Sequence, residues 1–482
     1  MIRASALAHI LGQFLIVLAG CMLVPLVFSA WLQTDLRPLG FSCLITFVFG
    51  AICTISASRP VTDLSQREGL LFVVLVWLAV SFFGALPFYF SVFFSSFTDA
   101  FFESVSGFTT TGATVLGRVE VLPHDLQFWR CFSHWLGGMG IVLLGIAILP
   151  LLVTGGMRLY RAEFSGARSE KLKPRITETA FALWKIYLAL TLAEFVALRL
   201  AGMKTFDAMC HTFSTLGTGG FSTRTASIAA FNSPAIEGVV IFFMLLSGIS
   251  FIQHYRLWIE RRPRVFFSDL ELWLYLLVAA GASLITFLSL LQQNQLPSAI
   301  ALRNSIFQVV SIMTTTGFVT DDFEKWLPLP QLILLALMFF GGCTGSTSGG
   351  LKSARIMLLS RVVNREFKRM VERRGVFPIR LGNQVIPENT IQSLLNLVYL
   401  AFLVNFVACL LLAAAGVDVL TSIAAVASTM FNVGPALGTV GPAEHYGHLP
   451  AFTKWVLSGC MLAGRLEFYT ILVIVTPAFW RK

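Results

Sequence analysis

The chain has 482 residues, of which 56% are hydrophobic and 12% charged, and its mean hydropathy is +0.78. Soluble domains are about half apolar and about a quarter charged, so this composition excludes a soluble fold and predicts an all-α integral membrane protein. The net charge of +10 does not indicate a nucleic-acid partner, because the basic residues lie in short segments between apolar runs.

Two apolar runs open the chain, His9 to Leu32 and Gly40 to Ala57. About 20 apolar residues, at a rise of about 1.5 Å per residue, cross the roughly 30 Å hydrocarbon core of a bilayer. We therefore predict a pair of transmembrane helices in residues 1–60, with the lipid bilayer as the chain's surroundings.

Four polar, glycine-bearing elbows follow: SGFTTTGATV, STLGTGGFST, SIMTTTGFVT and TMFNVGPALG. They recur about every hundred residues, which indicates an internal repeat. Each elbow comes after a long apolar run and a short amphipathic stretch, and a polar connection and a second apolar run follow it. This order predicts four pore repeats, in residues 61–165, 166–262, 263–375 and 376–482.

The amphipathic stretches are short, for example Asp99 to Phe108 and Asp418 to Met430. A helix of this length cannot cross the bilayer, so it must enter and return on the same side. Non-helical backbone survives at membrane depth only where protein or water satisfies it, so we expect the elbows to surround a water-filled centre. With the N-terminal pair and two spans per repeat, ten membrane-spanning segments are predicted.

The basic residues predict the topology, because Lys and Arg collect in cytoplasmic connections. An even number of spans puts both termini in the cytoplasm, in agreement with Arg3 and with Arg481 and Lys482. The connections expected there carry Arg158, Arg161, Arg168, Lys171, Lys173 and Arg175; Arg256, Arg261, Arg262 and Arg264; and Lys352, Arg355, Arg361, Arg365, Lys368, Arg369, Arg373, Arg374 and Arg380.

The elbows have the composition expected of an ion filter. A ring of backbone carbonyls replaces an ion's hydration shell without a net charge that would trap the ion. Glycine is required where φ is positive or another backbone approaches closely, and we predict such positions at Gly112, Gly219, Gly317 and Gly434. The short helices would point their negative ends at the ring and favour a cation, with Asp99, Asp207 and Asp418 as caps or first-turn acids.

The candidate cation-binding residues are Thr110, Thr111, Gly112, Thr218, Gly219, Thr315, Thr316, Gly317, Asn432, Val433 and Gly434. A lone elbow could equally be a polar loop, but four elbows at matched places disfavour that alternative. Thr218 and Val433 depart from the Thr-Thr-Thr-Gly form, so we do not expect the four elbows to be equivalent.

The repeated pattern, with TTTGAT, TGGFST, TTTGF and NVGPALG, resembles the Trk/Ktr/HKT superfamily of potassium transporters. The N-terminal pair, the stretch GGCTGSTSGG and the ending GRLEFYTILVIVTPAFWR are similar to its bacterial TrkH/TrkG branch. The resemblance covers essentially the whole chain. It implies a multi-pass protein of the bacterial inner membrane, with potassium as the substrate, held at the filter carbonyls only, and no covalently bound cofactor.

The same resemblance implies two protein partners. One is a second copy of the chain, in a homodimer. The other is a cytosolic nucleotide-binding regulatory subunit of the Trk A type on the inner face. The basic segments around Arg168 to Arg175 and Arg361 to Arg380 are candidate docking sites for that subunit, and contacts with anionic lipids are an equal alternative.

The stretch GGCTGSTSGG, residues 341–350, interrupts the second apolar run of the third repeat. A phosphate loop would require glycine directly before Lys352, where Leu351 stands, so nucleotide binding is not expected. The stretch is either a structural kink or, as the resemblance implies, an intramembrane loop that obstructs the pore and moves to open it. The candidate gate residues here are Gly341, Gly342, Gly345, Ser346, Thr347, Gly349 and Gly350.

Arg465 lies in the otherwise apolar second run of the fourth repeat. A buried arginine is costly in a membrane, so it must face a cavity or a partner. Glu467 is only two residues away, on another face of a helix, and is a poor partner. We expect Arg465 to belong to the gate, where it raises an electrostatic barrier to cations, and pairing with a neighbouring helix is the alternative.

Together these features predict potassium uptake through a gated pore that also passes rubidium. The alternative is an obligate proton- or sodium-coupled potassium symporter, for which no intramembrane carboxylate or histidine chain argues clearly. An enzyme is not expected, because no HExxH or GxSxG motif lies where it could act within the spans.

Overall fold

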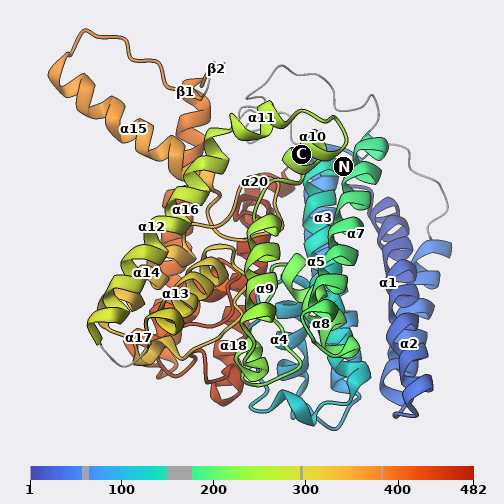
Figure 1. Ribbon diagram of the computed structural model, residues 1–482. Helices are drawn as coiled ribbons and strands as arrows, with labels where there is room; N and C mark the ends of the chain where they lie inside the picture. The colour runs from blue at the N-terminus through green and yellow to red at the C-terminus, as the bar shows by residue number, and fades with distance from the viewer. Residues whose placement is uncertain (1, 57–63, 149–175, 294–296, 382–383, 482) are drawn as a thin grey trace.

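The computed structural model describes residues 2–56, 64–148, 176–293, 297–381 and 384–481, which form a bundle of α-helices (Figure 1). In this part of the chain the only strands are β1 (Arg380–Leu381) and β2 (Gln384–Val385), which pair antiparallel. Both termini lie at the same end of the bundle (Figure 1). The predicted all-α fold is confirmed.

The N-terminal pair consists of α1 (Ala4–Leu32) and α2 (Arg37–Ile55), which pack side by side at one edge of the bundle (Figure 1). A Cβ atom on Gly12 of α1 would lie 2.6 Å from the carbonyl oxygen of Gly50 on α2. The two helices therefore approach each other through glycines, as small residues allow in membrane helix pairs.

After this pair, one order of elements occurs four times: a long helix, a short helix, an elbow and a second helix. Repeat 1 contains α3 (Gln66–Tyr89), α4 (Phe97–Phe108) and α5 (His124–Ile148). Repeat 2 contains α7 (Ile176–Leu200), α8 (Thr205–Leu216), α9 (Pro234–Ser247) and α10 (Phe251–Trp258), followed by α11 (Pro263–Phe267). Repeat 3 contains α12 (Leu270–Gln293), α13 (Ser298–Met313), α14 (Pro328–Met338) and α15 (Ser353–Val371).

Repeat 4 contains α16 (Glu388–Ala414), α17 (Val419–Met430), α18 (Ala451–Arg465) and α19 (Tyr469–Val475), followed by α20 (Pro477–Trp480). A short 3-10 turn lies between each elbow and the second helix of its repeat: η1 (Val119–Val121), η2 (Ser227–Phe231), η3 (Phe323–Lys325) and η4 (Tyr446–His448). The order of the helices within the described residues follows the order of the repeated sequence pattern. The basic segment 158–175 lies outside the described residues.

Six helices of the described residues are long and apolar enough to cross a membrane: α1, α2, α3, α7, α12 and α16. Two bent pairs, α9 with α10 and α18 with α19, pass the same test together, which gives up to eight spans. Two of the ten predicted spans remain. One falls at α5, and the residues after it, 149–175, lie outside the described part of the chain. The other falls at α14, which has 11 residues and ends at Met338.

The second helix is broken in three of the four repeats within the described residues, whereas the sequence pattern indicated a break only in repeat 3. The helices α9 and α10 meet at 97°, and α18 and α19 meet at 116°. Between α18 and α19 the backbone reverses through positive φ values at Glu467 and Phe468. The second apolar run of repeat 4, which contains Arg465, was predicted as one span because hydropathy reports where a chain is apolar and not the direction of a helix axis.

The four short helices, which we call the pore helices, are α4, α8, α13 and α17. Every residue of α4 from Ala100 to Phe108 is buried, as expected of a helix that other helices enclose on all sides. The predicted acids stand at the helix starts: Asp418 caps α17 by accepting a hydrogen bond from the Thr421 N–H at 3.0 Å, and Asp99 and Asp207 lie in first turns. The negative ends of the pore helices therefore lie at the elbows.

Candidate functional site

Each elbow begins where a pore helix ends and repeats one backbone turn. First a residue with a side chain adopts the left-handed conformation, with φ of 53° at Thr110, 53° at Thr218, 56° at Thr315 and 57° at Asn432. Two positions later a glycine has positive φ: 81° at Gly112, 77° at Gly220, 77° at Gly317 and 102° at Gly434. The four elbows share one backbone geometry although their side chains differ.

The second elbow has a different register from the one expected. Gly219 was predicted to hold the positive-φ position, but Gly220 takes that place. Gly219 instead corresponds to Thr111, Thr316 and Val433 of the other elbows. Two adjacent glycines leave the register ambiguous in a sequence, whereas the end of α8 at Leu216 fixes it in the structure.

A hydrogen bond back to the pore helix holds each turn. In all four elbows the N–H just before the positive-φ glycine donates to the carbonyl of a serine five residues earlier. The pairs are Thr111 with Ser106 (2.9 Å), Gly219 with Ser214 (2.8 Å), Thr316 with Ser311 (2.9 Å) and Val433 with Ser428 (2.8 Å). The sequence analysis did not single out these serines, although their recurrence at one position of every repeat was a usable signal.

The elbows contact one another in a closed ring. A Cβ atom on each positive-φ glycine would collide with a carbonyl oxygen of the next elbow: Gly112 with Gly219 at 2.0 Å, Gly220 with Thr316 at 2.0 Å, Gly317 with Val433 at 2.0 Å, and Gly434 with Thr111 at 2.5 Å. Only a residue without a side chain fits such an approach. The contacts run from repeat 1 through repeats 2, 3 and 4 and return to repeat 1, so four backbone carbonyls lie around one centre.

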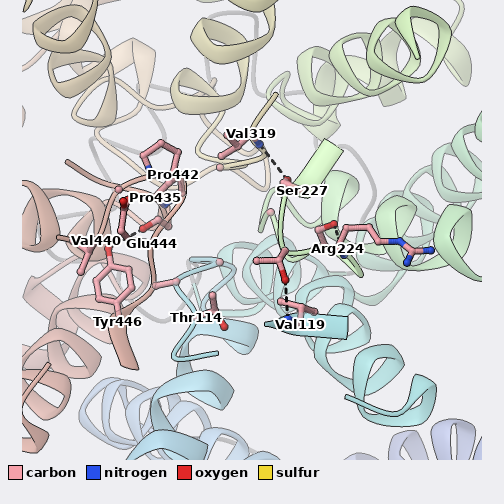
Figure 2. Close-up of a pocket in the computed structure, with 18 of the residues that line it drawn as sticks. Thr114, Val119, Arg224, Ser227, Val319, Pro435, Val440, Pro442, Glu444 and Tyr446 are labelled. Atoms are coloured by element: carbon pink, nitrogen blue, oxygen red, sulfur yellow. Dashed lines mark hydrogen bonds between the residues drawn. The ribbon is translucent and has the colours of Figure 1, made fainter. Parts of the chain in front are cut away.

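A cavity of about 80 Å³ lies over the ring, and all four glycines line it. Figure 2 shows its walls, which include Thr114 and Val119 from repeat 1, Ser227 from repeat 2, Val319 from repeat 3 and Glu444 from repeat 4. A water molecule needs about 10–15 Å³ of such space, so the cavity has room for a few waters or a partly hydrated ion but not for a large organic molecule.

Two arginines, Arg130 and Arg224, line this cavity, and each forms an ion pair with a carboxylate. The Arg224 guanidinium points away from the cavity (Figure 2) and forms an ion pair with Asp207 at 3.3 Å. Arg130 is buried behind the ring, where its Nε donates to the Glu103 carboxylate at 2.5 Å. Among the described residues no cluster of three or more His, Cys, Asp or Glu side chains could hold a metal ion, so the ring offers a cation its backbone oxygens.

The buried pair Arg130 and Glu103 joins the first two elbows. Arg130 also donates to the carbonyl of Ser222 at 3.0 Å, and its guanidinium lies 3.6 Å over the Phe221 ring. Glu103 accepts from the Val115 N–H at 3.0 Å. This pair was not predicted from the sequence, where its signal was a charged residue beyond the first turn of each of two largely apolar helices.

The residue nine positions before the ring glycine differs in each repeat: Glu103, His211, Gln308 and Ala425. Glu103 and His211 both form a hydrogen bond with the segment that follows their elbow, Glu103 with the Val115 N–H and His211 through its Nε2 with the Ser222 hydroxyl at 2.9 Å. In repeat 4 the Tyr446 hydroxyl takes over this support by donating to the Gly434 carbonyl at 2.8 Å. The backbone of the ring thus has nearly fourfold symmetry, whereas the side chains that hold each elbow in place differ between the repeats.

The gate candidates of repeat 3 form a non-helical loop between α14 and α15, which we call the gate loop (339–352). It is bonded to the ends of three pore helices. The Thr347 hydroxyl donates to the Leu216 carbonyl at 3.0 Å, the Ser348 hydroxyl to the Thr314 carbonyl at 2.8 Å, and the Gly350 N–H to the Phe431 carbonyl at 3.1 Å. The loop therefore lies directly against the ring, on the side where the pore helices end.

Glycines make this close fit possible. Gly341, Gly345 and Gly350 have positive φ. A Cβ atom on Gly349 would lie 2.3 Å from the Phe431 carbonyl oxygen, and one on Gly342 would lie 2.6 Å from the Ser348 hydroxyl. Ser346 closes the loop on itself by donating to the Cys343 carbonyl at 2.6 Å. All seven loop candidates are thus brought together beside the ring.

Arg465 ends α18 and reaches the gate loop. Its guanidinium donates to the Thr347 carbonyl at 2.9 Å and to the Gly137 carbonyl of α5 at 3.3 Å, and the side chain is buried. Glu467 is not its partner, as expected, and pairs with Arg355 at 2.9 Å. No ion pair to Arg465 is found among the described residues, so its positive charge lies against the loop without a carboxylate beside it.

Comparison with known proteins gives a consistent result. A family model described as "Cation transport protein", TrkH, matches residues 41–482. The Trk system potassium uptake proteins TrkH of Salmonella typhimurium and of Escherichia coli K12 are each 42% identical over 481 residues, which is 99% of this chain and 99% of theirs. The crystal structure of the potassium transporter TrkH from Vibrio parahaemolyticus superposes with a TM-score of 0.92 at 39% identity, covering 99% of this chain and all of that one.

Proposed function

Because the chain belongs to the TrkH family of cation transport proteins, we propose that it takes up potassium ions across the bacterial inner membrane, and that rubidium passes by the same route. The family is one of transporters and not of enzymes. The relatives named above are potassium uptake proteins. The ring of backbone carbonyls in this chain is a structure that could bind potassium ions during such uptake.

The closed ring of glycine-to-carbonyl contacts is the observation that carries the proposal. Because Gly112, Gly220, Gly317 and Gly434 each admit a neighbouring carbonyl, the carbonyls of all four repeats gather around one point. Carbonyl oxygens replace the hydration shell of a potassium ion, and the negative ends of four pore helices add a field that favours a cation. The potassium sites would be formed by the backbone oxygens of the Thr110–Gly112, Thr218–Gly220, Thr315–Gly317 and Asn432–Gly434 stretches.

The gate loop and Arg465 would close this route. The loop covers the pore-helix ends, and Arg465 adds a positive charge beneath a ring that attracts cations. Replacing Arg465 by methionine should raise the unstimulated rubidium leak, because it removes both the charge and the bond to the Thr347 carbonyl. A leak equal to that of the parent, at equal amounts of folded protein, would assign Arg465 a purely structural role.

The proposal extends to topology and partners. Both termini lie at one end of the bundle (Figure 1). We assign this end to the cytoplasm because Lys and Arg collect in cytoplasmic connections. The relatives are named as parts of a Trk system, which supports a transporter of more than one component. We expect a homodimer that carries a cytosolic nucleotide-binding subunit on this face, near the exposed basic side chains Lys368, Arg369, Arg373 and Arg374.

The decisive experiment is rubidium uptake into proteoliposomes that hold the purified protein alone, at an imposed voltage and without proton or sodium gradients. Uptake that follows the voltage, competes with potassium and resists sodium would support a potassium-selective pore. Uptake that appears only with a proton or sodium gradient would favour the second candidate, an obligately coupled symporter. The observation that favours a coupled symporter is Glu194, a glutamate of α7 whose carboxyl group is buried and could bind a coupling ion.

A further inference from the structure

Glu194 is an acidic side chain in the middle of the protein with no assigned task. It lies on α7, six residues before the helix ends at Leu200, which is about 9 Å at 1.5 Å per residue. Its side chain is fully buried, with 0% of its surface exposed. Neither carboxyl oxygen has a hydrogen-bond partner within the part of the chain that the structure describes. This combination is rare because a buried polar group is normally satisfied.

The donors around Glu194 are already bonded to other acceptors. The Thr215 hydroxyl lies beside the carboxyl but donates to the His211 carbonyl at 2.8 Å. On α7 itself, the Thr191 hydroxyl donates to the Tyr187 carbonyl at 2.7 Å, and the Tyr187 hydroxyl donates to the Trp135 carbonyl at 3.1 Å. Among the described residues, no donor forms a hydrogen bond to either carboxyl oxygen that would stabilise a negative charge at this place.

The charged and titratable side chains on the elements that pack against α7 are also engaged elsewhere. The helices in contact with α7 are α5, α8, α9 and α10. Among the described residues of these helices, the buried charged and histidine side chains and their partners are Asp125 with Ser29, Arg130 with Glu103, His134 with Ser214, Asp207 with Thr223 and Arg224, His211 with Ser222, Glu237 with Arg303, and His254 with the Leu246 carbonyl. The buried Arg465 of α18 donates to the Thr347 carbonyl of the gate loop and to the Gly137 carbonyl of α5.

An ionised carboxylate without a partner is far more costly in such surroundings than a neutral acid, because burial removes the water that would solvate the charge. The same reasoning holds for an acidic residue inside a membrane helix, which is expected to be neutral or to mark a functional site. The surroundings of Glu194 therefore favour the neutral acid over the carboxylate.

Glu194 is also next to the part of the protein that the gate loop holds. Thr215 is the last residue but one of α8, and the carbonyl of the following Leu216 accepts the Thr347 hydroxyl of the gate loop. The Thr347 carbonyl in turn accepts from Arg465. A departure of the gate loop would free the end of α8 beside Glu194 and admit water to the carboxyl, and water stabilises its ionised form.

We propose that Glu194 is a proton-binding site inside the membrane, whose carboxyl is protonated while the gate loop is bonded to α8 and releases its proton when the loop leaves. The ligand is a proton, and the site links the transport of cations to pH. The link to transport rests on the proposed function, whereas the protonation itself does not. Since ionisation accompanies opening, a rise in pH favours the open arrangement.

The first test measures protonation directly and needs no transport. Infrared spectra of the purified protein in lipid, at about neutral pH, report the C=O stretching band of a protonated carboxylic acid, which a carboxylate lacks. We expect a part of this band to disappear in Glu194→Gln. The matched control is Glu237→Gln, a buried glutamate of α9 that is paired with Arg303 at 2.8 Å and should keep the Glu194 component. A band that Glu194→Gln leaves unchanged would overturn the proposal.

The second test measures rubidium uptake as a function of pH. One proton changes the ratio of two arrangements by at most about tenfold per pH unit, so uptake by the parent should rise by up to that factor. Glu194→Gln, which imitates the neutral acid, should stay at the low rate at every pH, while Glu237→Gln should follow the parent. The same pH profile in Glu194→Gln and the parent would overturn the link to opening.

Two further outcomes are informative. Uptake that depends on sodium instead of pH, with no infrared band from Glu194, would mean that the carboxylate holds a sodium ion, and would overturn proton binding. If the protein transported no rubidium under any condition, the proposed potassium function would fail, but the infrared band would still decide whether Glu194 is protonated.

Discussion

At the scale of single residues, the carbonyl oxygens of neighbouring elbows determine which positions of the ring must be glycine. Gly220 combines a φ of 77° with an approach of 2.0 Å between the place of its missing Cβ and the Thr316 carbonyl oxygen. A side chain here would have to displace the backbone of another repeat, so the requirement for glycine comes from both its own conformation and its contact.

Replacing Gly220 by alanine should therefore damage the filter. A left-handed non-glycine residue costs about 1–3 kcal/mol before any clash, so we expect at least about a tenfold loss of potassium selectivity over sodium in rubidium-uptake competition. The control is Gly459→Ala on α18, where an added Cβ meets nothing within 4 Å. Unchanged selectivity in Gly220→Ala would remove the ring from the proposed filter.

The buried pair Arg130 and Glu103 allows a second prediction at this scale. Their side chains are 2% and 0% exposed, so Glu103→Gln would leave a buried arginine without its counter-charge. The loss of one partner of such a pair costs about 3–5 kcal/mol, which should appear as a lower unfolding temperature of the purified protein. The double variant Glu103→Gln with Arg130→Met should lose less, because no unpaired charge remains. Equal losses in both variants would contradict this account.

At the scale of elements, the gate loop is held by hydrogen bonds between its backbone and polar side-chain groups and the helices around it. The Thr347 hydroxyl reaches both the Leu216 carbonyl at 3.0 Å and the Ser247 carbonyl at 3.3 Å, and so ties the loop to α8 and α9. These contacts are between polar groups that could exchange protein partners for water, which is what a movable element requires.

Thr347→Val keeps the shape of the side chain and removes the donor. The loss of about 0.5–1.5 kcal/mol of loop attachment should raise the unstimulated rubidium leak by about two- to tenfold. Ser360→Ala is the control, since that hydroxyl donates only within α15, to the Met357 carbonyl at 2.8 Å. If the leak of Thr347→Val equalled that of Ser360→Ala, the loop would not be a barrier held by this residue.

At the scale of the whole molecule, the third and fourth repeats meet at their polar connections through two carboxyl groups. Glu324 of η3 accepts from the Gly438 N–H at 2.5 Å, and the carboxyls of Glu324 and Glu444 flank Gly441. Partial burial, together with the neighbouring carboxyls of Glu444 and Asp322, raises the pKa of Glu324 above its usual value. Lys325 is engaged with Asp322 at 3.0 Å and does not relieve this pair.

A raised pKa means that the folded protein binds this proton more tightly than the unfolded chain does. Its contribution to stability is therefore complete below the ordinary glutamate pKa of 4.5 and is lost as the pH rises through the raised value. The unfolding temperature of the parent should fall as the pH rises above 4.5. We expect this fall to be smaller in Glu324→Gln and unchanged in Glu366→Gln, on the exposed side of α15. A parent protein whose unfolding temperature rises between these pH values, and rises less in Glu324→Gln, would reverse the sign and contradict the assignment.

The sequence by itself determined the class of fold, the fourfold repeat and the places of the elbows. Apolar runs, the spacing of glycines and acids at helix starts are local properties, because each is dictated by the backbone or the surroundings of a short stretch. For that reason the pore helices, the elbows at Gly112, Gly317 and Gly434 and the break before Lys352 could all be predicted.

The tertiary structure decided what depends on contacts between distant segments. It moved the second ring position from Gly219 to Gly220, closed the ring, joined Arg465 to Thr347, broke α18 from α19 and left Glu194 without a partner. These features join residues that lie about a hundred or more positions apart, or depend on what is absent around a side chain. Neither is encoded in a local pattern, because packing against other repeats sets the register, the direction and the partners of each segment.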